Sequence, residues 1–116
     1  MKEKDAVKYY RGKERYNCAQ AILKAYQEDF NIDDEQIRDY KKFGGGNAEG
    51  NLCGALFAVN KLINNKDKSK NIEQSIYQAA GATTCREIRK LKKLSCNGCV
   101  EKSSQLLSEH VEDRNE

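Results

Sequence analysis

The sequence predicts an all-α fold, and three of its features support this prediction. The chain of 116 residues has no proline, its apolar residues recur three and four positions apart, and few segments alternate apolar and polar residues as strands do. A chain of this length is expected to form one domain, here residues 1–116. We therefore expect a small single-domain bundle of about five to seven short helices, with a glycine-rich loop before the central one.

Three helices are expected before the glycine-rich loop, within residues 5–10, 17–30 and 33–43. Asn17 is a suitable N-cap for the second of these helices. Its apolar residues fall on one face at the helical period; they are Ala19, Ile22, Leu23, Tyr26 and Phe30. The third helix is expected to turn Ile37 and Tyr40 inward and to end at Phe43.

The central helix is expected over residues 52–63, because this is the most apolar segment of the chain. Asn51 is a suitable N-cap, which would place Cys53 in the first turn of the helix. There the unpaired N–H groups and the helix dipole favour a thiolate over a thiol. The small residues Gly54 and Ala58 would let a neighbouring helix or a bound group approach closely.

The second half of the chain is expected to begin with a polar surface linker over residues 64–71, followed by a helix that ends at Gly81. Thr83 or Thr84 then caps a short helix, and Ser95 or Asn97 opens the last one. The last helix is expected to bury four apolar residues, Val100, Leu106, Leu107 and Val111. The acidic C-terminal segment 112–116 is expected to fray.

The composition limits the classes of function. Charged residues make up 34% of the chain and the formal net charge is +3, so the helices have heavily solvated faces and the core is thin. A metal centre, disulfides or self-association as a homo-oligomer would then supply part of the stability. The charge does not indicate a specific nucleic-acid partner, and no segment is apolar over the length that a membrane partner would require. The chain is expected in the cytoplasm.

The five cysteines share one local pattern, in which each follows a capping-type residue by one or two positions. The pairs are Asn17 and Cys18, Asn51 and Cys53, Thr84 and Cys85, Ser95 and Cys96, and Asn97 and Cys99. Each cysteine is therefore predicted near the start of a helix. A reducing compartment disfavours a framework of structural disulfides. Thiolates from several helix starts could instead converge on one metal centre or one redox site.

The glycine-rich loop is a second candidate feature. Gly44, Gly45 and Gly46 allow the backbone to approach a bound group closely, and their N–H groups can donate to an anion or to sulfur. Gly54 directly follows Cys53. These four glycines are candidate cofactor-binding residues; the alternative is that the loop is only a tight connection between two helices.

Cys96 and Cys99 form a CxxC pair, a spacing that suits a metal site or a redox-active disulfide. Together with Cys53 they are the candidate catalytic residues. Val100 stands where a histidine would be needed for covalent haem attachment, and the sequence has no second CxxC to complete a zinc ribbon. The single histidine, His110, is expected to pack in the last helix.

Five basic residues precede the CxxC pair; they are Arg86, Arg89, Lys90, Lys92 and Lys93. They are expected to form a solvated helix face. The alternative is a surface that lowers the pKa of nearby thiols or docks an acidic electron-transfer partner. The sequence has neither a Ser/His/Asp pattern nor a phosphate-binding loop, so no hydrolase or transferase motif is present. If the chain is an enzyme, it is expected to be an oxidoreductase.

The order of these motifs resembles the bacterial and archaeal C_GCAxxG_C_C family of redox-active proteins. The resemblance covers residues 13–110 and rests on Asn17-Cys18-Ala19-Gln20, Phe43-Gly44-Gly45-Gly46, Cys53-Gly54-Ala55, Thr84-Cys85-Arg86-Glu87, and Cys96 with Val100. It implies a small all-helical cytoplasmic domain with an iron–sulfur centre as one basis for its redox role. The metal ligands would be the four family cysteines, Cys18, Cys53, Cys85 and Cys96. Ala58 stands where the family has a glycine, and Cys99 is an addition to the pattern.

Three functions remain open on this basis. The first is electron transfer through an iron–sulfur cluster, which suits several convergent cysteines beside N–H groups that donate to sulfur. The second is a cluster-free thiol/disulfide oxidoreductase or redox sensor that uses Cys96 with Cys99, or Cys53 with another cysteine. The third is a structural zinc module that serves as an interaction domain. No motif identifies the redox partner of the first two.

Overall fold

The computed structural model describes residues 2–10, 12–13, 15–43 and 52–114. The side chains of residues 2–5, 96 and 110–114 are not among those described. The all-α prediction is confirmed, because the described residues form eight α-helices and one short 3-10 helix. Within this part of the chain, β pairing is limited to two isolated bridges, one between Tyr10 and Tyr16 and one between Leu52 and Thr84.

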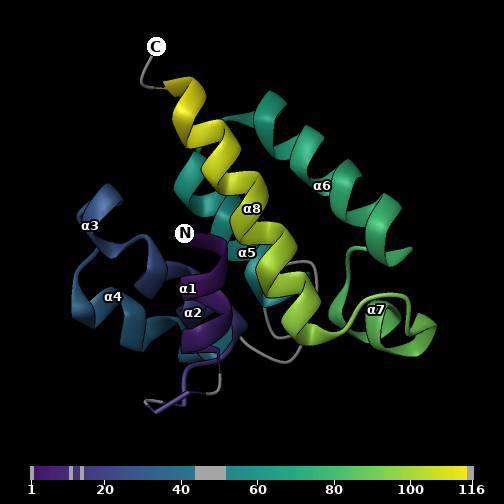
Figure 1. The fold of residues 1–116 in the computed structure, drawn as a ribbon, viewed down its shortest axis with the longest axis horizontal. Coiled ribbons are helices and arrows are strands. Elements are labelled where there is room, and N and C mark those ends of the chain that lie inside the picture. The colour runs from purple at the N-terminus through teal and green to yellow at the C-terminus, as the bar shows by residue number, and fades with distance from the viewer. Residues whose placement is uncertain (1, 11, 14, 44–51, 115–116) are drawn as a thin grey trace.

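The apolar helix α5 (Gly54–Ile63) packs against α2 (Cys18–Ala25), α6 (Lys66–Ala80) and α8 (Cys96–Arg114). Figure 1 shows α8 crossing the molecule, with α6 on one side of it and α1 (Lys2–Tyr9) on the other. One cluster of buried apolar side chains includes residues from all five of these helices. The central place predicted for α5 is therefore confirmed.

The helix predicted over residues 17–30 is divided into α2 and α3 (Gln27–Phe30), because Tyr26 leaves the helical conformation with φ −108° and ψ 15°. The Tyr26 side chain is buried, and its hydroxyl donates to the carbonyl oxygen of Ser104 in α8 at 2.8 Å. Asn31 adopts the left-handed conformation, with φ 53°, and ends α3. This break adds one α-helix to the number predicted.

The third predicted helix is formed by α4 (Asp34–Asp39) and the 3-10 helix η1 (Tyr40–Phe43). Ile37 is buried as predicted. The rings of Tyr40, Phe43 and Phe57 pack together with centroids 4.8 to 6.0 Å apart, which holds the end of η1 against α5. The candidate residues Gly44, Gly45 and Gly46, and the predicted N-cap Asn51, lie outside the described residues.

The prediction of a polar linker over residues 64–71 is wrong, because α6 begins at Lys66. Asn65 caps this helix, and its side-chain oxygen accepts the N–H of Lys68 at 3.1 Å. The first turn and a half of α6 presents only polar side chains, so it lacks the apolar period that identifies a helix in a sequence. The buried residues Ile72, Ile76 and Ala80 come later, four positions apart, and Gly81 ends the helix with φ 82°.

The last two helices begin where the sequence predicts. Thr84 is the N-cap of α7 (Cys85–Leu91), and the hydroxyl of Ser95 accepts the N–H of Gly98 at 3.0 Å at the start of α8. Val100, Leu106 and Leu107 of α8 are buried as predicted, and the side chain of Val111 lies outside the described side chains. The helix continues to Arg114, into the segment expected to fray. None of the helices in the described ranges has the length and apolar character that crossing a bilayer requires.

Candidate functional site

Three candidate cysteines are the first residues of helices, as the capping pattern predicts: Cys18 opens α2, Cys85 opens α7 and Cys96 opens α8. At α2 the cap is a reciprocal pair of bonds, known as a capping box. The N–H of Gln20 donates to the side-chain oxygen of Asn17 at 2.8 Å, and the N–H of Asn17 donates to the side-chain oxygen of Gln20 at 3.0 Å. The start of α2, and Cys18 with it, is fixed by these two bonds.

The same two polar side chains also connect α2 to the segment that precedes the glycine-rich loop. The amide nitrogen of Asn17 donates to the carbonyl oxygens of Lys41 at 2.9 Å and Tyr40 at 3.2 Å. The amide nitrogen of Gln20, which is buried, donates to the carbonyl oxygen of Ile37 at 3.0 Å. These three bonds hold the Cys18 end of α2 against α4 and η1.

The prediction that Cys53 lies in the first turn of its helix is wrong, because α5 begins at Gly54 and Cys53 is its N-cap, with φ −52° and ψ 131°. The extended backbone has a partner in a distant segment. Leu52 forms an isolated antiparallel bridge with Thr84, and the N–H of Cys53 donates to the carbonyl oxygen of Thr83 at 2.9 Å. This pairing places Cys53 beside the segment that leads into Cys85.

Gly54 allows the sulfur of Cys18 to approach the backbone at the start of α5. A Cβ atom at Gly54 would lie 2.5 Å from the Cys18 sulfur, 3.2 Å from the carbonyl oxygen of Phe43 and 3.4 Å from the amide nitrogen of Ala19. The first of these distances is far shorter than carbon and sulfur atoms tolerate without a bond between them. The candidate role of Gly54 as a close-approach residue therefore has a specific neighbour, the Cys18 sulfur.

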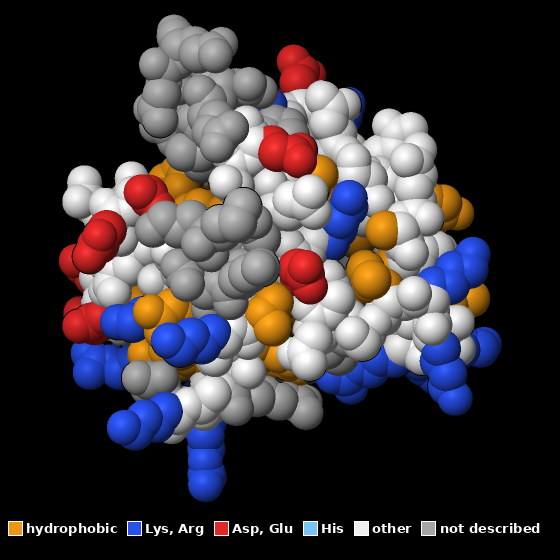
Figure 2. All heavy atoms as spheres, viewed as in Figure 1, with side chains coloured by type: hydrophobic (Ala, Val, Ile, Leu, Met, Phe, Trp, Pro, Cys, Tyr) orange, Lys and Arg blue, Asp and Glu red, His pale blue; other side chains and the backbone are white. Residues whose placement is uncertain are grey.

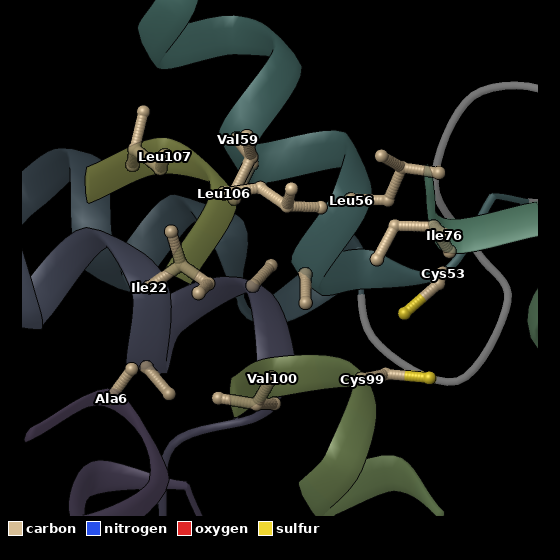
Figure 3. Packing of buried hydrophobic residues seen from close by; sticks show 14 of the residues in the cluster. Ala6, Ile22, Cys53, Leu56, Val59, Ile76, Cys99, Val100, Leu106 and Leu107 are labelled. Carbon is tan, nitrogen blue, oxygen red and sulfur yellow. The ribbon is translucent and has the colours of Figure 1, made fainter. Parts of the chain in front are cut away.

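Three sulfurs form a hydrogen-bonded row in which Cys53 stands between Cys18 and Cys99. Cys53 and Cys99 are 6% and 2% exposed, and Cys18 is partly buried. Figure 3 shows Cys53 at the start of α5 and Cys99 on α8, with their sulfurs close together at the edge of the apolar core. All three residues are thiols. The row therefore joins three helices through sulfur.

Backbone N–H groups also donate to these sulfurs. The sulfur of Cys18 accepts hydrogen bonds from the N–H groups of Ala19 and Ala55, and that of Cys53 accepts one from Leu56. Ala19 lies in the first turn of α2, and Ala55 and Leu56 lie in the first turn of α5. The first turn of a helix has N–H groups without intrahelical partners, so these bonds use donors that the helices leave available.

The pKa of Cys53 is shifted upward to about 12, against the direction that the sequence predicts. The hydrogen bond from Cys18 lowers the pKa, but the hydrogen bond to Cys99, burial and the charge of Cys99 raise it by more. The pKa of Cys18 is raised far above its usual range, first by its hydrogen bond to Cys53 and then by burial. In the metal-free, reduced protein both residues are therefore thiols at neutral pH.

This shift predicts that Cys53 resists alkylation in the folded, metal-free protein. At pH 7.5 its rate with iodoacetamide is expected to be roughly a thousandfold lower than in urea, since an unfolded cysteine has a pKa of about 8.5. The raised folded-state pKa contributes stability that is complete below about pH 8.5 and is lost as the pH rises toward 12. The urea midpoint should accordingly fall between pH 8 and pH 11. Equal alkylation rates in folded and unfolded protein would contradict the burial of this thiol.

The other candidate ligands approach this row to different extents. Cys85 is buried, and the bridge between Leu52 and Thr84 brings the start of α7 next to Cys53. The side chain of Cys96 lies outside the described side chains, so the convergence of all four family cysteines stays a prediction. Among the side chains that are described, no group of three or more Cys, His, Asp or Glu encloses a point where a metal ion could sit. The sulfurs of Cys18, Cys53 and Cys99 lie in a row and do not surround a centre.

The basic run lies at the corner of the molecule formed by α7. Its five side chains, Arg86, Arg89, Lys90, Lys92 and Lys93, are all exposed, and Figure 2 shows Lys and Arg side chains gathered at that corner. The interpretation as a solvated helix face is confirmed. The exposed side chain of Leu91 lies within this run.

A protein-family model described as "Putative redox-active protein (C_GCAxxG_C_C)" matches residues 16–110. The chain belongs to this family. No curated protein and no solved structure matches the chain. The C_GCAxxG_C_C match spans every candidate cysteine, from Cys18 to Cys99.

In this C_GCAxxG_C_C protein the contact between Cys53 and Cys99 is the part of the site that sequence reasoning missed. The sequence associates Cys99 with Cys96 through the CxxC spacing, whereas the structure places the Cys99 sulfur against Cys53. Residues three apart on a helix share a face, so the CxxC spacing is consistent with a shared site. The sequence does not show which other helix packs against that face of α8, because this depends on tertiary packing.

Proposed function

We propose that this protein carries electrons through an iron–sulfur cluster held by Cys18, Cys53, Cys85 and Cys96. The observation that carries the proposal is the meeting of Cys18 and Cys53 from two helix starts, with backbone N–H groups donating to both sulfurs. Thiolates are the ligands that iron–sulfur clusters use, and hydrogen bonds to sulfur tune their potentials. The donor atoms are of the chemical type that such a cluster binds, but the side chains that the structure describes do not enclose a position for a metal ion, so binding would require them to rearrange.

When bound, an iron–sulfur cluster supplies a one-electron couple. The residues of the chain contribute its surroundings. Cys53 is almost completely buried, and Leu56 and Ile76 lie close to it in Figure 3, so water is largely excluded from that side. The N–H groups of Ala19, Ala55 and Leu56 would compensate the negative charge on the Cys18 and Cys53 sulfurs if these held a cluster as thiolates.

The exposed cations of α7 would attract a redox partner with an acidic surface. Because Cys85 is the first residue of α7, the basic side chains begin one residue from a proposed ligand. Segment 86–93 carries five positive side chains and one negative one, while the whole chain has a formal net charge of only +3. A concentration of charge of this kind speeds the encounter with an oppositely charged protein.

The experiment that tests the proposal is anaerobic purification, followed by analysis for iron, sulfide and zinc and by visible spectroscopy. We expect iron and sulfide with visible absorption, a large loss of all three in Cys96→Ser, and their retention in Cys99→Ser. Zinc without iron or sulfide would favour a structural zinc module. A colourless parent protein without either metal would contradict the proposal.

A second candidate, thiol/disulfide exchange, is favoured by the direct contact between the sulfurs of Cys53 and Cys99. In this scheme one of the two thiolates attacks a partner disulfide, and the other then attacks the resulting mixed disulfide. The chain loses two electrons and two protons as its disulfide forms, and the partner disulfide gains them and becomes two thiols. This candidate predicts a two-electron couple in metal-free protein that either Cys53→Ser or Cys99→Ser abolishes.

A further inference from the structure

Two surfaces of opposite charge lie on opposite sides of the molecule. The acidic edge is residues 28–35, in α3, the start of α4 and the turn between them, and it carries five carboxylates and no basic side chain. All five are exposed; they are Glu28, Asp29, Asp33, Asp34 and Glu35. The basic corner is residues 86–93, which carry five exposed cations and one carboxylate. Figure 1 shows α3 and α4 on the left and α7 on the right, and Figure 2 shows Asp and Glu side chains along the left edge.

The acidic edge and the basic corner cannot compensate each other within one molecule. The central helices lie between them in Figure 1, and the molecule extends 34 Å along its longest axis. At physiological ionic strength, exposed charges are screened beyond ~8 Å. The attraction between these two surfaces can therefore act at short range only between two molecules.

We propose that the basic corner of one copy binds the acidic edge of a second copy of this chain. Opposite charges on facing surfaces select the partner and its orientation, and they speed the encounter. Leu91, which is 46% exposed within the basic corner, provides the apolar contact that protein interfaces place inside a charged rim. The inference uses neither a metal ion nor a redox reaction, so it does not depend on the proposed function.

A second copy fits these surfaces better than an unrelated acidic protein, because it offers two contacts of the same kind. Two copies that lie side by side in antiparallel orientation bring each basic corner to the other's acidic edge, and this arrangement closes as a twofold-symmetric dimer. The second contact forms within an already assembled pair, so the two together bind more tightly than either alone. In such a dimer α7 is covered, and the second copy competes with an acidic redox partner for this surface.

Sedimentation equilibrium of the full chain tests the inference, with a thiol reductant present to prevent intermolecular disulfides. At about 0.01 M salt the screening length is ~30 Å, and at about 1 M it is ~3 Å. At protein concentrations up to about 1 mM, we expect twice the single-chain mass of 13.2 kDa at the lower salt and the mass of one chain at the higher salt. A single-chain mass at both salt concentrations would overturn the inference. It would leave the proposed function standing, because iron and sulfide analysis tests that function separately.

A matched pair of double variants tests whether the location of the charge matters. Arg86→Glu with Lys90→Glu reverses two exposed cations of the basic corner, and the dissociation constant of the dimer should rise at least about tenfold. Lys66→Glu with Lys70→Glu makes the same change in net charge at the end of α6 away from α7, where both lysines are exposed. This control should dimerise like the parent. Equal weakening in the two variants would overturn the inference, since net charge and not the basic corner would then control association.

A reversal at the acidic edge completes the test. Glu28→Lys with Glu35→Lys should weaken the dimer to a similar extent, since both carboxylates are exposed on that edge. A chain that combines the reversals at both surfaces keeps the parent's formal net charge of +3. It again presents one acidic and one basic surface, so it should dimerise at low salt. Far-UV circular dichroism checks that each variant keeps its helices. A folded combined variant that stays monomeric would overturn the pairing of these two surfaces.

Discussion

Gly54→Ala should destabilise the protein by about 1–3 kcal/mol and displace Cys18 from the sulfur row. The added Cβ would lie 2.5 Å from the Cys18 sulfur and 3.2 Å from the backbone oxygen of Phe43. Phe43 cannot move away easily, because its ring is packed against Tyr40 and Phe57. The free energy of unfolding from urea titration of metal-free protein measures the first effect, and the alkylation rate of Cys18 measures the second. Iron retention should fall as well.

Gly98→Ala is the matched control for this substitution. A Cβ at Gly98 would lie 2.7 Å from a terminal methyl carbon of Leu94, which is the far end of a flexible side chain that is only partly buried. Gly98 lies within a helix, where alanine is favoured over glycine by roughly 0.5–1 kcal/mol. The control is therefore expected to be neutral or mildly stabilising. If Gly54→Ala were as stable as Gly98→Ala, the close approach of Cys18 to the backbone of α5 would be disproved.

Asn17→Ala is expected to reduce the free energy of unfolding by about 2–4 kcal/mol. Loss of the cap at α2 contributes about 1 kcal/mol, and loss of the two bonds to the carbonyl oxygens of Tyr40 and Lys41 contributes about 0.5–1.5 kcal/mol each. Because Cys18 directly follows Asn17, the iron content should also fall. Urea titration and iron analysis of the same preparations check both expectations.

One further variant separates the two roles of the Asn17 side chain, and a second, at Asn65, is a control. Asn17→Asp keeps the oxygen that accepts from Gln20 but lacks the N–H donors, so it should lose the bonds to η1 while it retains the cap. Asn65→Ala removes a cap of the same type at α6, where a single bond to Lys68 is recorded and no cysteine is near in sequence. It should cost about 1 kcal/mol and leave iron unchanged. Equal losses of stability and iron in Asn17→Ala and Asn65→Ala would rule out a special role for Asn17.

Local signals were sufficient to predict the helix starts that carry cysteine. Asn17, Thr84 and Ser95 are residues of the capping type directly before the helix starts, so Cys18, Cys85 and Cys96 could be placed from the sequence. The side chains of Asn17 and Ser95 accept an N–H three residues on, whereas that of Thr84 makes no capping bond. The buried positions of α2 and α5 were predictable for a similar reason. Their apolar residues recur at the period of the helix that buries them.

The remaining features depend on contacts between distant segments. The start of α5 was misplaced because Leu52 and Cys53 pair with Thr84 and Thr83, and no property of residues 51–54 reveals that partner. The raised pKa of Cys53 has the same origin, since the contact with Cys99 requires α8 to pack on α5. The early part of α6 was missed because its solvent-facing turns contain no apolar residue to mark a period.

The packing of α1 against α8 has a consequence for the way the protein is made. Synthesis proceeds from the N-terminus, so α2 and α5 can bring Cys18 and Cys53 together while α8 is still being translated. During that interval α1 can pack against α2 but lacks α8, its other main partner, and Cys53 lacks its contact with Cys99. Such contacts between distant segments form late and slow folding. The nascent chain therefore passes through a stage in which α8 does not yet cover Cys18 and Cys53, and insertion of the proposed cluster would either use that stage or follow the docking of α8.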